Sequence, residues 1–170
     1  MKAIKKSFFA VILCVSMLFV TAFSAFAFET KAGDELQEGW IQVSENRFEN
    51  ATTGEYFEII PSTNRASAER VSFDFKIKNS FRCPTKFLAS GTTATVDAWA
   101  DRVDSSGRVD NSVSLPFNIE VGSKTAEFST GGFTDSVSIS GLRAGSTYTV
   151  IASSPDATNG YYIEGNATVE

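Results

Sequence analysis

The sequence of 170 residues contains no histidine, only two cysteines and only four prolines. Without histidine, the chain cannot carry a Ser-His-Asp or Cys-His catalytic centre, a histidine general base or the usual histidine-containing zinc site. Cys14 lies in a segment that we expect to be removed, which leaves Cys83 as the only thiol of the mature chain. A single thiol excludes an internal disulfide and a CxxC metal site. We expect Cys83 to be buried and unreactive, as free cysteine usually is, and the alternative is a covalent link to a partner.

Long apolar runs are also scarce, and the densest one stands at the start of the chain. A short basic stretch containing Lys2, Lys5 and Lys6 precedes an apolar run over residues 7–20, and Ala25-Phe26-Ala27 follows with a small-x-small pattern. This order is typical of a secretory signal peptide, and the run is shorter than the roughly 20 residues of a membrane span. We therefore predict a helical signal peptide over residues 1–27, export to the extracellular space, a bacterial source and no membrane span in the mature chain.

Removal of the predicted signal changes the charge of the chain. The first 27 residues hold three lysines and no acidic residue, so 143 residues remain with 12 basic and 20 acidic side chains and a net charge of -8. A nucleic-acid-binding domain needs a basic face, so this balance argues against such a partner. Residues 28–39 are polar and acidic, which predicts a flexible lead-in. Residues 40–170 have a size that is ordinary for one domain.

From Trp40 onward the apolar residues alternate with polar ones, which is typical of strands with one buried face. Turn residues, chiefly glycine, asparagine and aspartate, interrupt the alternation every 8–12 residues, and no segment keeps a helical period. The pattern predicts an all-β antiparallel sandwich of eight to ten strands, with the Trp40–Ile60 hairpins as a small cap. The expected strands lie near 40–44, 47–50, 55–60, 71–78, 92–101, 112–121, 125–128, 134–140, 146–153 and 161–169. Pro116 is expected to place its strand at an edge or a bulge.

The inward-facing positions of this alternation give the expected core. Its members are Phe73, Phe75, Ile77, Val96, Ala98, Val113, Leu115, Phe117, Ile119, Val137, Ile139, Leu142, Tyr148 and Val150.

The segment 141–150 contains Leu142, Gly145, Tyr148 and Val150 in the spacing Leu-x-x-Gly-x-x-Tyr-x-Val. This spacing resembles the E–F corner of fibronectin type III modules. The resemblance implies an immunoglobulin-like sandwich in which a tyrosine hydroxyl ties a corner to the backbone. Trp99 lies at a plausible distance upstream to match the buried tryptophan of that family. The resemblance implies no function, because such sandwiches host many.

Two sets of residues are candidates for binding sites. Calcium binds several oxygen ligands in extracellular modules, and the turn at Ser105-Ser106-Gly107 is flanked by acidic residues; the alternative is a solvated hairpin. Exposed aromatic rings can contact a glycan or another partner, and the alternative is that they fill the core. Tyr161 and Tyr162 are adjacent on a strand, so one should point inward and one outward. The calcium candidates are Asp101, Asp104 and Asp110, and the glycan or partner candidates are Trp40, Tyr56, Tyr161 and Tyr162, with Trp99 expected in the core.

These observations predict a secreted, non-enzymatic module that binds an extracellular protein or glycan, or that builds surface or matrix structure. No cofactor is expected apart from calcium at the acidic turn. The alternative is a soluble secreted effector, either an inhibitor or a bacteriocin-like toxin. A third hypothesis is a small glycoside hydrolase, since paired carboxylates can hydrolyse glycosides without histidine.

Overall fold

A computed structural model describes residues 36–61, 69–155 and 160–170, and Leu36–Glu170 form one compact unit. This part of the chain contains only strands and connections, as the alternating pattern predicts, and every pairing is antiparallel. No helix among these residues is long and apolar enough to cross a membrane. The predicted signal peptide and residues 28–35 of the predicted lead-in lie outside the described residues. Leu36 is half-buried against the core, and residues 37–39 form a turn before the first strand.

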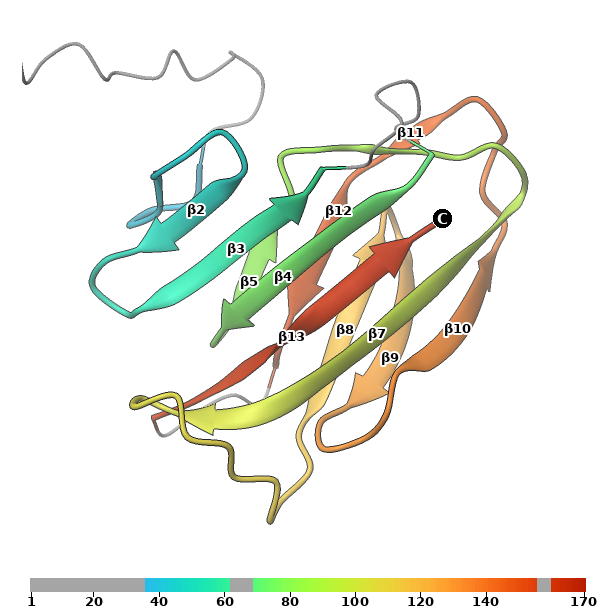
Figure 1. Ribbon diagram of the computed structural model, residues 1–170. Helices are drawn as coiled ribbons and strands as arrows, with labels where there is room; N and C mark the ends of the chain where they lie inside the picture. Colours follow the sequence, from blue (N-terminus) through green and yellow to red (C-terminus); the bar gives the residue numbers. More distant parts are fainter. Residues whose placement is uncertain (1–35, 62–68, 156–159) are drawn as a thin grey trace, which may run out of the picture. The chain divides into compact units, whose positions relative to one another are not determined.

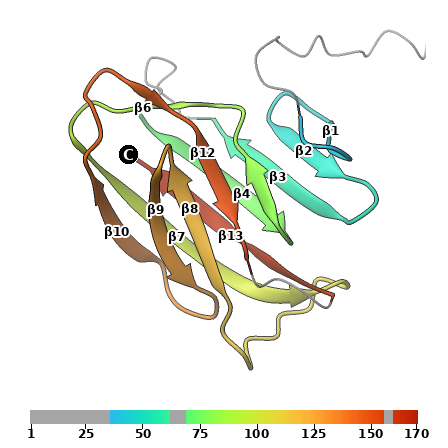
Figure 2. The same cartoon turned by 180° about the vertical axis from the view of Figure 1, so that it is seen from behind.

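The strands form two main sheets, and Figure 1 looks onto the larger one. The large sheet has the order β1 (Ile41–Gln42), β2 (Arg47–Asn50), β3 (Glu55–Ile60), β4 (Val71–Ile77), β13 (Tyr161–Val169), β7 (Thr93–Asp104) and β10 (Asp135–Ser140). The small sheet has the order β5 (Ser80–Arg82), β12 (Val150–Ser153), β8 (Pro116–Val121) and β9 (Lys124–Ser129), and it lies in front in Figure 2. A short pair joins β6 (Phe87–Leu88) to β11 (Thr147–Tyr148).

The described residues thus contain 13 strands, more than the predicted eight to ten. The alternating pattern does not indicate β5 and β6, which are too short to show two full periods of alternation. It also treats β11 and β12 as one strand, whereas they pair with different partners.

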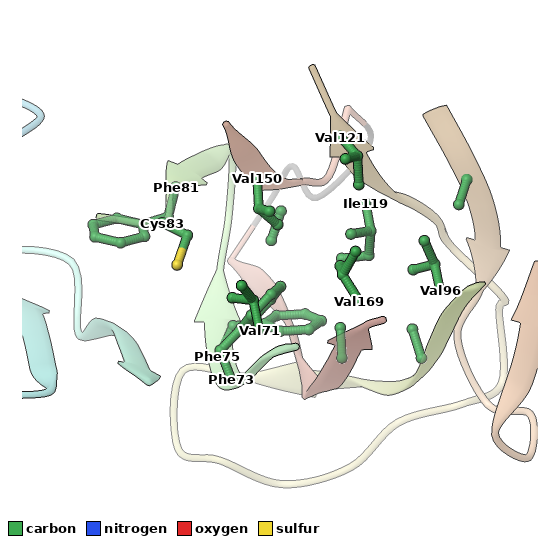
Figure 3. Packing of buried hydrophobic residues seen from close by; sticks show 14 of the residues in the cluster. Val71, Phe73, Phe75, Phe81, Cys83, Val96, Ile119, Val121, Val150 and Val169 are labelled. Atoms are coloured by element: carbon green, nitrogen blue, oxygen red, sulfur yellow. The ribbon is translucent and has the colours of Figure 1, made fainter. Parts of the chain in front are cut away.

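The core lies between the two main sheets (Figure 3). Phe75 of the large sheet and Phe117 of the small sheet have ring centroids 6.0 Å apart. Most of the predicted core is confirmed as buried, and Leu115, Val137 and Tyr148 are half-buried against it. Val113 is a wrong prediction, because 53% of it is exposed. The strand starts only at Pro116, so residues 112–115 lie outside the sheets and their alternation does not reflect burial.

Pro116 is likewise placed differently from its prediction. Strand β8 lies between β12 and β9, not at an edge. Pro116 is its first residue, and pairing with β12 begins only at Asn118. A proline is tolerated at the start of a strand because no ladder partner needs its missing N–H there.

The chain passes between the sheets at most of its connections. From β4 onward, β4, β7, β10 and β13 belong to the large sheet and β5, β8, β9 and β12 to the small one. The resulting orders, β4-β13-β7-β10 facing β5-β12-β8-β9, form a jelly roll of two Greek keys. An immunoglobulin sandwich places its strands in a different order, so the immunoglobulin-like prediction is not confirmed. The antiparallel two-sheet sandwich is confirmed.

The corner that carries the family resemblance nevertheless has the predicted local geometry. The Tyr148 hydroxyl accepts a hydrogen bond of 2.7 Å from the Arg143 backbone N–H, and Leu142 is buried. The corner leads the chain from β10 of the large sheet toward β12 of the small one. The motif therefore predicts a crossing between sheets and not a particular strand order.

The segment predicted as a cap instead widens the large sheet. Strands β1, β2 and β3 continue it beyond β4 through regular antiparallel pairing. Their inner face packs on Phe81 of β5. The centroid of the Phe81 ring lies 4.3 Å from that of Trp40 and 4.5 Å from that of Phe57. Aromatic burial at this edge therefore attaches the first hairpin to both sheets.

Candidate functional site

The outer face of the large sheet carries a row of three polar and aromatic side chains. Strand register places Asp74 of β4 opposite Asn166 of β13, and Asn166 opposite Trp99 of β7. These three strands lie side by side in Figure 1. Because neighbouring strands are 4.7–4.9 Å apart, the row spans roughly 10 Å across the sheet.

A second row lies next to the first and borders the same space. Strand register aligns Tyr56, Lys76, Glu164 and Asp101 across β3, β4, β13 and β7. The Tyr56 hydroxyl donates a hydrogen bond of 3.0 Å to Glu164, and the Lys76 ammonium lies 3.6 Å from the other oxygen of that carboxylate. This row is therefore held by contacts within the protein.

The two rows line a groove of about 350 Å³. The loop after β7 borders it through Gly107 and Val109. The volume lies in the range of small-molecule sites, about 300–1,000 Å³. We call this space the Trp99 groove; its lining comprises Tyr56, Asp74, Trp99, Asp101, Val103, Gly107, Val109, Glu164, Gly165 and Asn166.

The floor of the groove depends on a close approach of two strands. An added Cβ at Gly165 of β13 would lie 2.0 Å from the Trp99 carbonyl oxygen and 2.6 Å from the Ala100 Cα. Only glycine leaves enough space for the backbone there. Gly165 thus lets β13 lie close to the part of β7 that presents the Trp99 ring.

The first row differs from the second because its polar groups are free within the described part of the chain. The Asp74 carboxylate, the Asn166 amide and the Trp99 indole N–H have no hydrogen bond or ion pair there. All three side chains are half-buried. Free acceptors and donors that converge beside an aromatic ring can bond a ligand without first losing a protein contact.

The electrostatic environment of the groove disfavours additional negative charge. Desolvation, and secondarily the Glu58 carboxylate on the neighbouring strand, raise the pKa of Asp74 above its usual value. Desolvation and the Glu164 carboxylate raise the pKa of Tyr56, which stays a neutral hydrogen-bond donor. A perturbed acid in a groove is a recognised sign of a functional site.

Only one of the four predicted glycan contacts lies in this groove. Tyr56 lines it. Trp40 is buried against Phe81. Tyr161 is half-buried with the Arg102 guanidinium 4.3 Å from its ring, at one end of the sandwich.

Tyr162 is buried, although it lies on the outer sheet face. Its hydroxyl donates to the Thr53 carbonyl, and the ammonium groups of Lys76 and Lys78 lie 5.0 and 4.5 Å from its ring. The prediction that Tyr161 and Tyr162 point to opposite faces is consistent with the register of β13, but neither lines the Trp99 groove.

The prediction that Trp99 lies in the core is wrong. The side chain is half-buried on the outer face and is not part of the core. The core residues Ala98 and Ala100 flank it in the chain, so alternation alone places Trp99 on the opposite face with Asp97 and Asp101. The resemblance to fibronectin type III modules instead favours a buried tryptophan, which is why the two expectations differ.

The three predicted calcium ligands are engaged with different donors of the β7–β8 connection. Asp101 accepts a hydrogen bond of 2.7 Å from the Asn111 amide. One oxygen of Asp104 accepts bonds from the Ser106 N–H, the Ser106 hydroxyl and the Arg108 N–H, which closes the turn.

Asp110 is held by Ser112 and by the buried Arg102 guanidinium, which also donates to the Asp110 carbonyl. The hydrogen bonds from Ser106 to Asp104 and from Ser112 to Asp110 lower the pKa of each carboxylate, to about 2 for Asp110. No group of three acidic or cysteine side chains in the described residues is arranged to hold a metal ion. In the described structure, Asp104 and Asp110 order a hairpin.

Cys83 is buried, with 1% of its surface exposed. Desolvation raises the pKa of its thiol to about 12, so the nucleophilic thiolate is scarce at neutral pH. This placement agrees with the expectation of a buried, unreactive cysteine.

A second hollow of about 860 Å³ lies at the connection between β9 and β10. Phe133 stands beside it with 97% of its surface exposed. Its other aromatic ring, Phe128, is buried in the core, so Phe133 offers this hollow an exposed ring that carries no hydrogen-bonding group. The polar part of its lining includes Asn118, Glu127, Ser129, Thr134 and Asp135.

No protein-family model and no curated protein matches the chain. Among solved structures, the chain is similar to the C-terminal CBM6 of LamC, a marine laminarinase from Zobellia galactanivorans. The two sequences are 14% identical, the TM-score is 0.33, and the similarity covers 67% of this chain and 88% of that chain. A similarity at this TM-score assigns neither a fold nor a ligand to this chain.

Proposed function

We propose that this chain is a non-enzymatic module that binds a glycan in the Trp99 groove. The observation that carries the proposal is the row of Asp74, Asn166 and Trp99, whose polar groups have no partner within the described residues. A structural role would engage these groups with other protein atoms, as it does for Asp104 and Asp110 in the hairpin that follows β7. A ligand that supplies several hydroxyl groups beside an apolar ring face would satisfy all three.

Each member of the row has a distinct part in this proposal. The Trp99 ring offers a flat apolar surface for the less polar face of a sugar ring, and its N–H is a donor. The Asp74 carboxylate accepts hydrogen bonds from sugar hydroxyls. The Asn166 amide both donates and accepts, so it can bond a hydroxyl in either role. Tyr56 extends the aromatic border at the side of β3.

We also propose that the module acts outside the cell. This rests on the basic stretch, apolar run and small-x-small pattern of residues 1–27. Mass spectrometry of protein recovered from the culture medium of a bacterial host tests the proposal. A mature chain that begins at Phe28 is the expected result, and retention of the first 27 residues would contradict it.

The test of glycan binding is affinity electrophoresis against a panel of soluble polysaccharides, followed by calorimetry with any that retard the protein. Trp99→Ala should weaken binding at least tenfold, which corresponds to about 1.4 kcal/mol. Phe133→Ala is the control, because it removes an exposed aromatic ring outside the groove. Reducing-end assays on the same mixtures should show no hydrolysis.

Three outcomes contradict the proposal. If Phe133→Ala abolishes binding and Trp99→Ala does not, the ligand occupies the β9–β10 hollow. If the panel produces no retardation, the Trp99 groove does not bind these glycans. A rise in reducing ends that Asp74→Asn abolishes would instead support the glycoside hydrolase.

A further inference from the structure

The Trp99 groove has a one-sided charge. Its described lining contains the carboxylates of Asp74, Asp101 and Glu164 and no lysine or arginine. Neutral sugar binding needs hydrogen-bonding groups and an aromatic face, but it does not require three carboxylates around one groove. The excess of carboxylates in the groove therefore indicates a property of the ligand other than its hydroxyl groups.

Two cations near the groove are paired with carboxylates. Lys76 lies 3.6 Å from Glu164, with 14% of its side chain exposed. Arg47 forms ion pairs with Glu49 and Glu58 at 2.6 and 2.7 Å. These pairs offset part of the surrounding negative charge.

Two groove carboxylates remain without a cationic partner in the described chain. Asp101 is bonded to the Asn111 amide, which is neutral. Asp74 has no hydrogen bond or ion pair within the described residues. Asp74 lies on β4 and Asp101 lies on β7, on the two sides of the central strand β13. Both therefore border the groove in front of β13.

The ionised form of Asp74 is disfavoured by its surroundings, first by desolvation and then by Glu58. A bound cation would offset both effects, since an opposite charge within about 4–6 Å stabilises a carboxylate. The face of Trp99 would add a favourable interaction, because tryptophan is the strongest cation-binding ring within about 6 Å of its centroid. The aromatic ring and the acids thus favour the same kind of ligand.

Building on the proposed glycan site, we propose that the Trp99 groove selects a sugar chain that carries free amino groups, such as a polymer of 2-amino-2-deoxy sugars. The sugar ring lies on Trp99, and its ammonium group lies against Asp74 with Asp101 on the far side of the groove. An N-acetylated sugar lacks the charge, and a uronate or sulfated sugar would add negative charge to a groove that already has an excess.

Calorimetry with three oligosaccharides of equal length and linkage, made of glucosamine, N-acetylglucosamine and glucose, tests this selectivity. The glucosamine chain should bind at least tenfold more tightly than the other two. Its affinity should fall as sodium chloride is raised from 0.05 to 0.5 M, since salt screens exposed charges over the Debye length of about 10 Å at 0.1 M. The other two affinities should change little.

Two substitutions connect the preference to the groove. Asp74→Asn keeps the size of the side chain and one acceptor oxygen but removes the charge, so it should lower the glucosamine affinity about tenfold more than it lowers the glucose affinity. Glu127→Gln is the control, because it removes an exposed carboxylate on β9, outside the Trp99 groove. Trp99→Ala should weaken all three ligands.

The outcomes separate this inference from the proposed function. If the glucose or N-acetylglucosamine chain binds as tightly as glucosamine and Trp99→Ala weakens it, the glycan site stands and the amino-sugar selectivity is wrong. If none of the three binds and the polysaccharide panel is also negative, both proposals fail. If polylysine binds through Asp74 while the glucosamine chain does not, the groove recognises a basic peptide and the amino-sugar proposal is overturned.

Discussion

The carboxylates of the hairpin that follows β7, Asp104 and Asp110, differ from those of the Trp99 groove in the partners that they have. In the hairpin, Asp104 and Asp110 each accept several hydrogen bonds from nearby backbone and side-chain donors. In the groove, Asp74 accepts none within the described residues. The pKa values follow this contrast, because those of Asp104 and Asp110 are lowered and that of Asp74 is raised.

This contrast separates structural acids from candidate binding acids more clearly than their number does. A carboxylate whose charge is met by local donors contributes to folding and has little capacity left for a ligand. A half-buried carboxylate without donors costs stability, and binding can compensate for that cost. Asp101, Asp104 and Asp110 cluster in the chain and so indicate a site, whereas Asp74 and Glu164 join Asp101 in the groove from strands far apart in sequence.

The largest expected effect concerns the floor of the groove. Gly165→Ala should destabilise the fold by about 3 kcal/mol, because the new Cβ would meet the Trp99 carbonyl oxygen at 2.0 Å and the backbone must move apart. Urea denaturation measures the loss. Gly91→Ala is the control, since an added Cβ there would meet nothing nearer than 4.0 Å. Equal stability of the two variants would show that the strands do not need this close approach.

The next effect concerns the cation that orders the hairpin. The Arg102 guanidinium is buried and donates to the Asp110 carbonyl at 2.7 Å and to the Ser112 hydroxyl at 3.1 Å. Arg102→Met should therefore cost about 2 kcal/mol of unfolding free energy. It should leave glycan binding in the Trp99 groove within about twofold, which is 0.4 kcal/mol. Arg82→Met, at an exposed position on β5, is the control for loss of a positive charge.

The two faces of the strands could be predicted from the sequence, but their order could not. Alternation correctly places Phe73, Phe75, Ile119 and Val150 in the core, since it reports directly which side chains leave water. It does not report which strand lies beside which. The corner at Tyr148 forms as predicted, yet the same local bond fits a jelly roll as well as an immunoglobulin sandwich.

The site could be predicted only in part for a related reason. Trp99 lies on the outer face by simple alternation with Ala98 and Ala100. Its proximity to Asp74 and Asn166 depends on β13 lying between β4 and β7, which follows from the strand order. Patterns within single segments therefore cannot predict that residues 74, 99 and 166 lie next to one another.

A smaller effect should appear when the hairpin acids are titrated. Hydrogen bonds from Ser112 lower the pKa of Asp110 to about 2. The unfolded chain should protonate this residue near its usual value of about 3.9, so its stabilising contribution is present above that pH and is lost as the pH falls toward 2. Asp110→Asn should flatten this part of the stability profile, measured as urea midpoints from pH 2 to 5. Asp135→Asn controls for the change in net charge, and a profile that Asp110→Asn leaves unchanged would contradict the structural role.

The smallest effect has the opposite sign and concerns Asp74. Because its pKa is raised in the folded chain, the native state binds this proton more tightly than the unfolded state does, so ionisation costs stability once the pH exceeds the raised value. Asp74→Asn should therefore stabilise the unliganded protein at neutral pH by about 0.5 kcal/mol or less, given how exposed the group is. The gain should vanish below about pH 3.9, where wild-type Asp74 is protonated in both states.

Asp97→Asn removes a carboxylate from the same face outside the groove lining and should not reproduce this pH dependence. If Asp74→Asn destabilises the protein at neutral pH, the carboxylate is structural like those of the hairpin. If Asp74→Asn both stabilises the protein and weakens glucosamine binding, the Asp74 carboxylate lowers the stability of the fold at the position where the proposed ligand requires its charge.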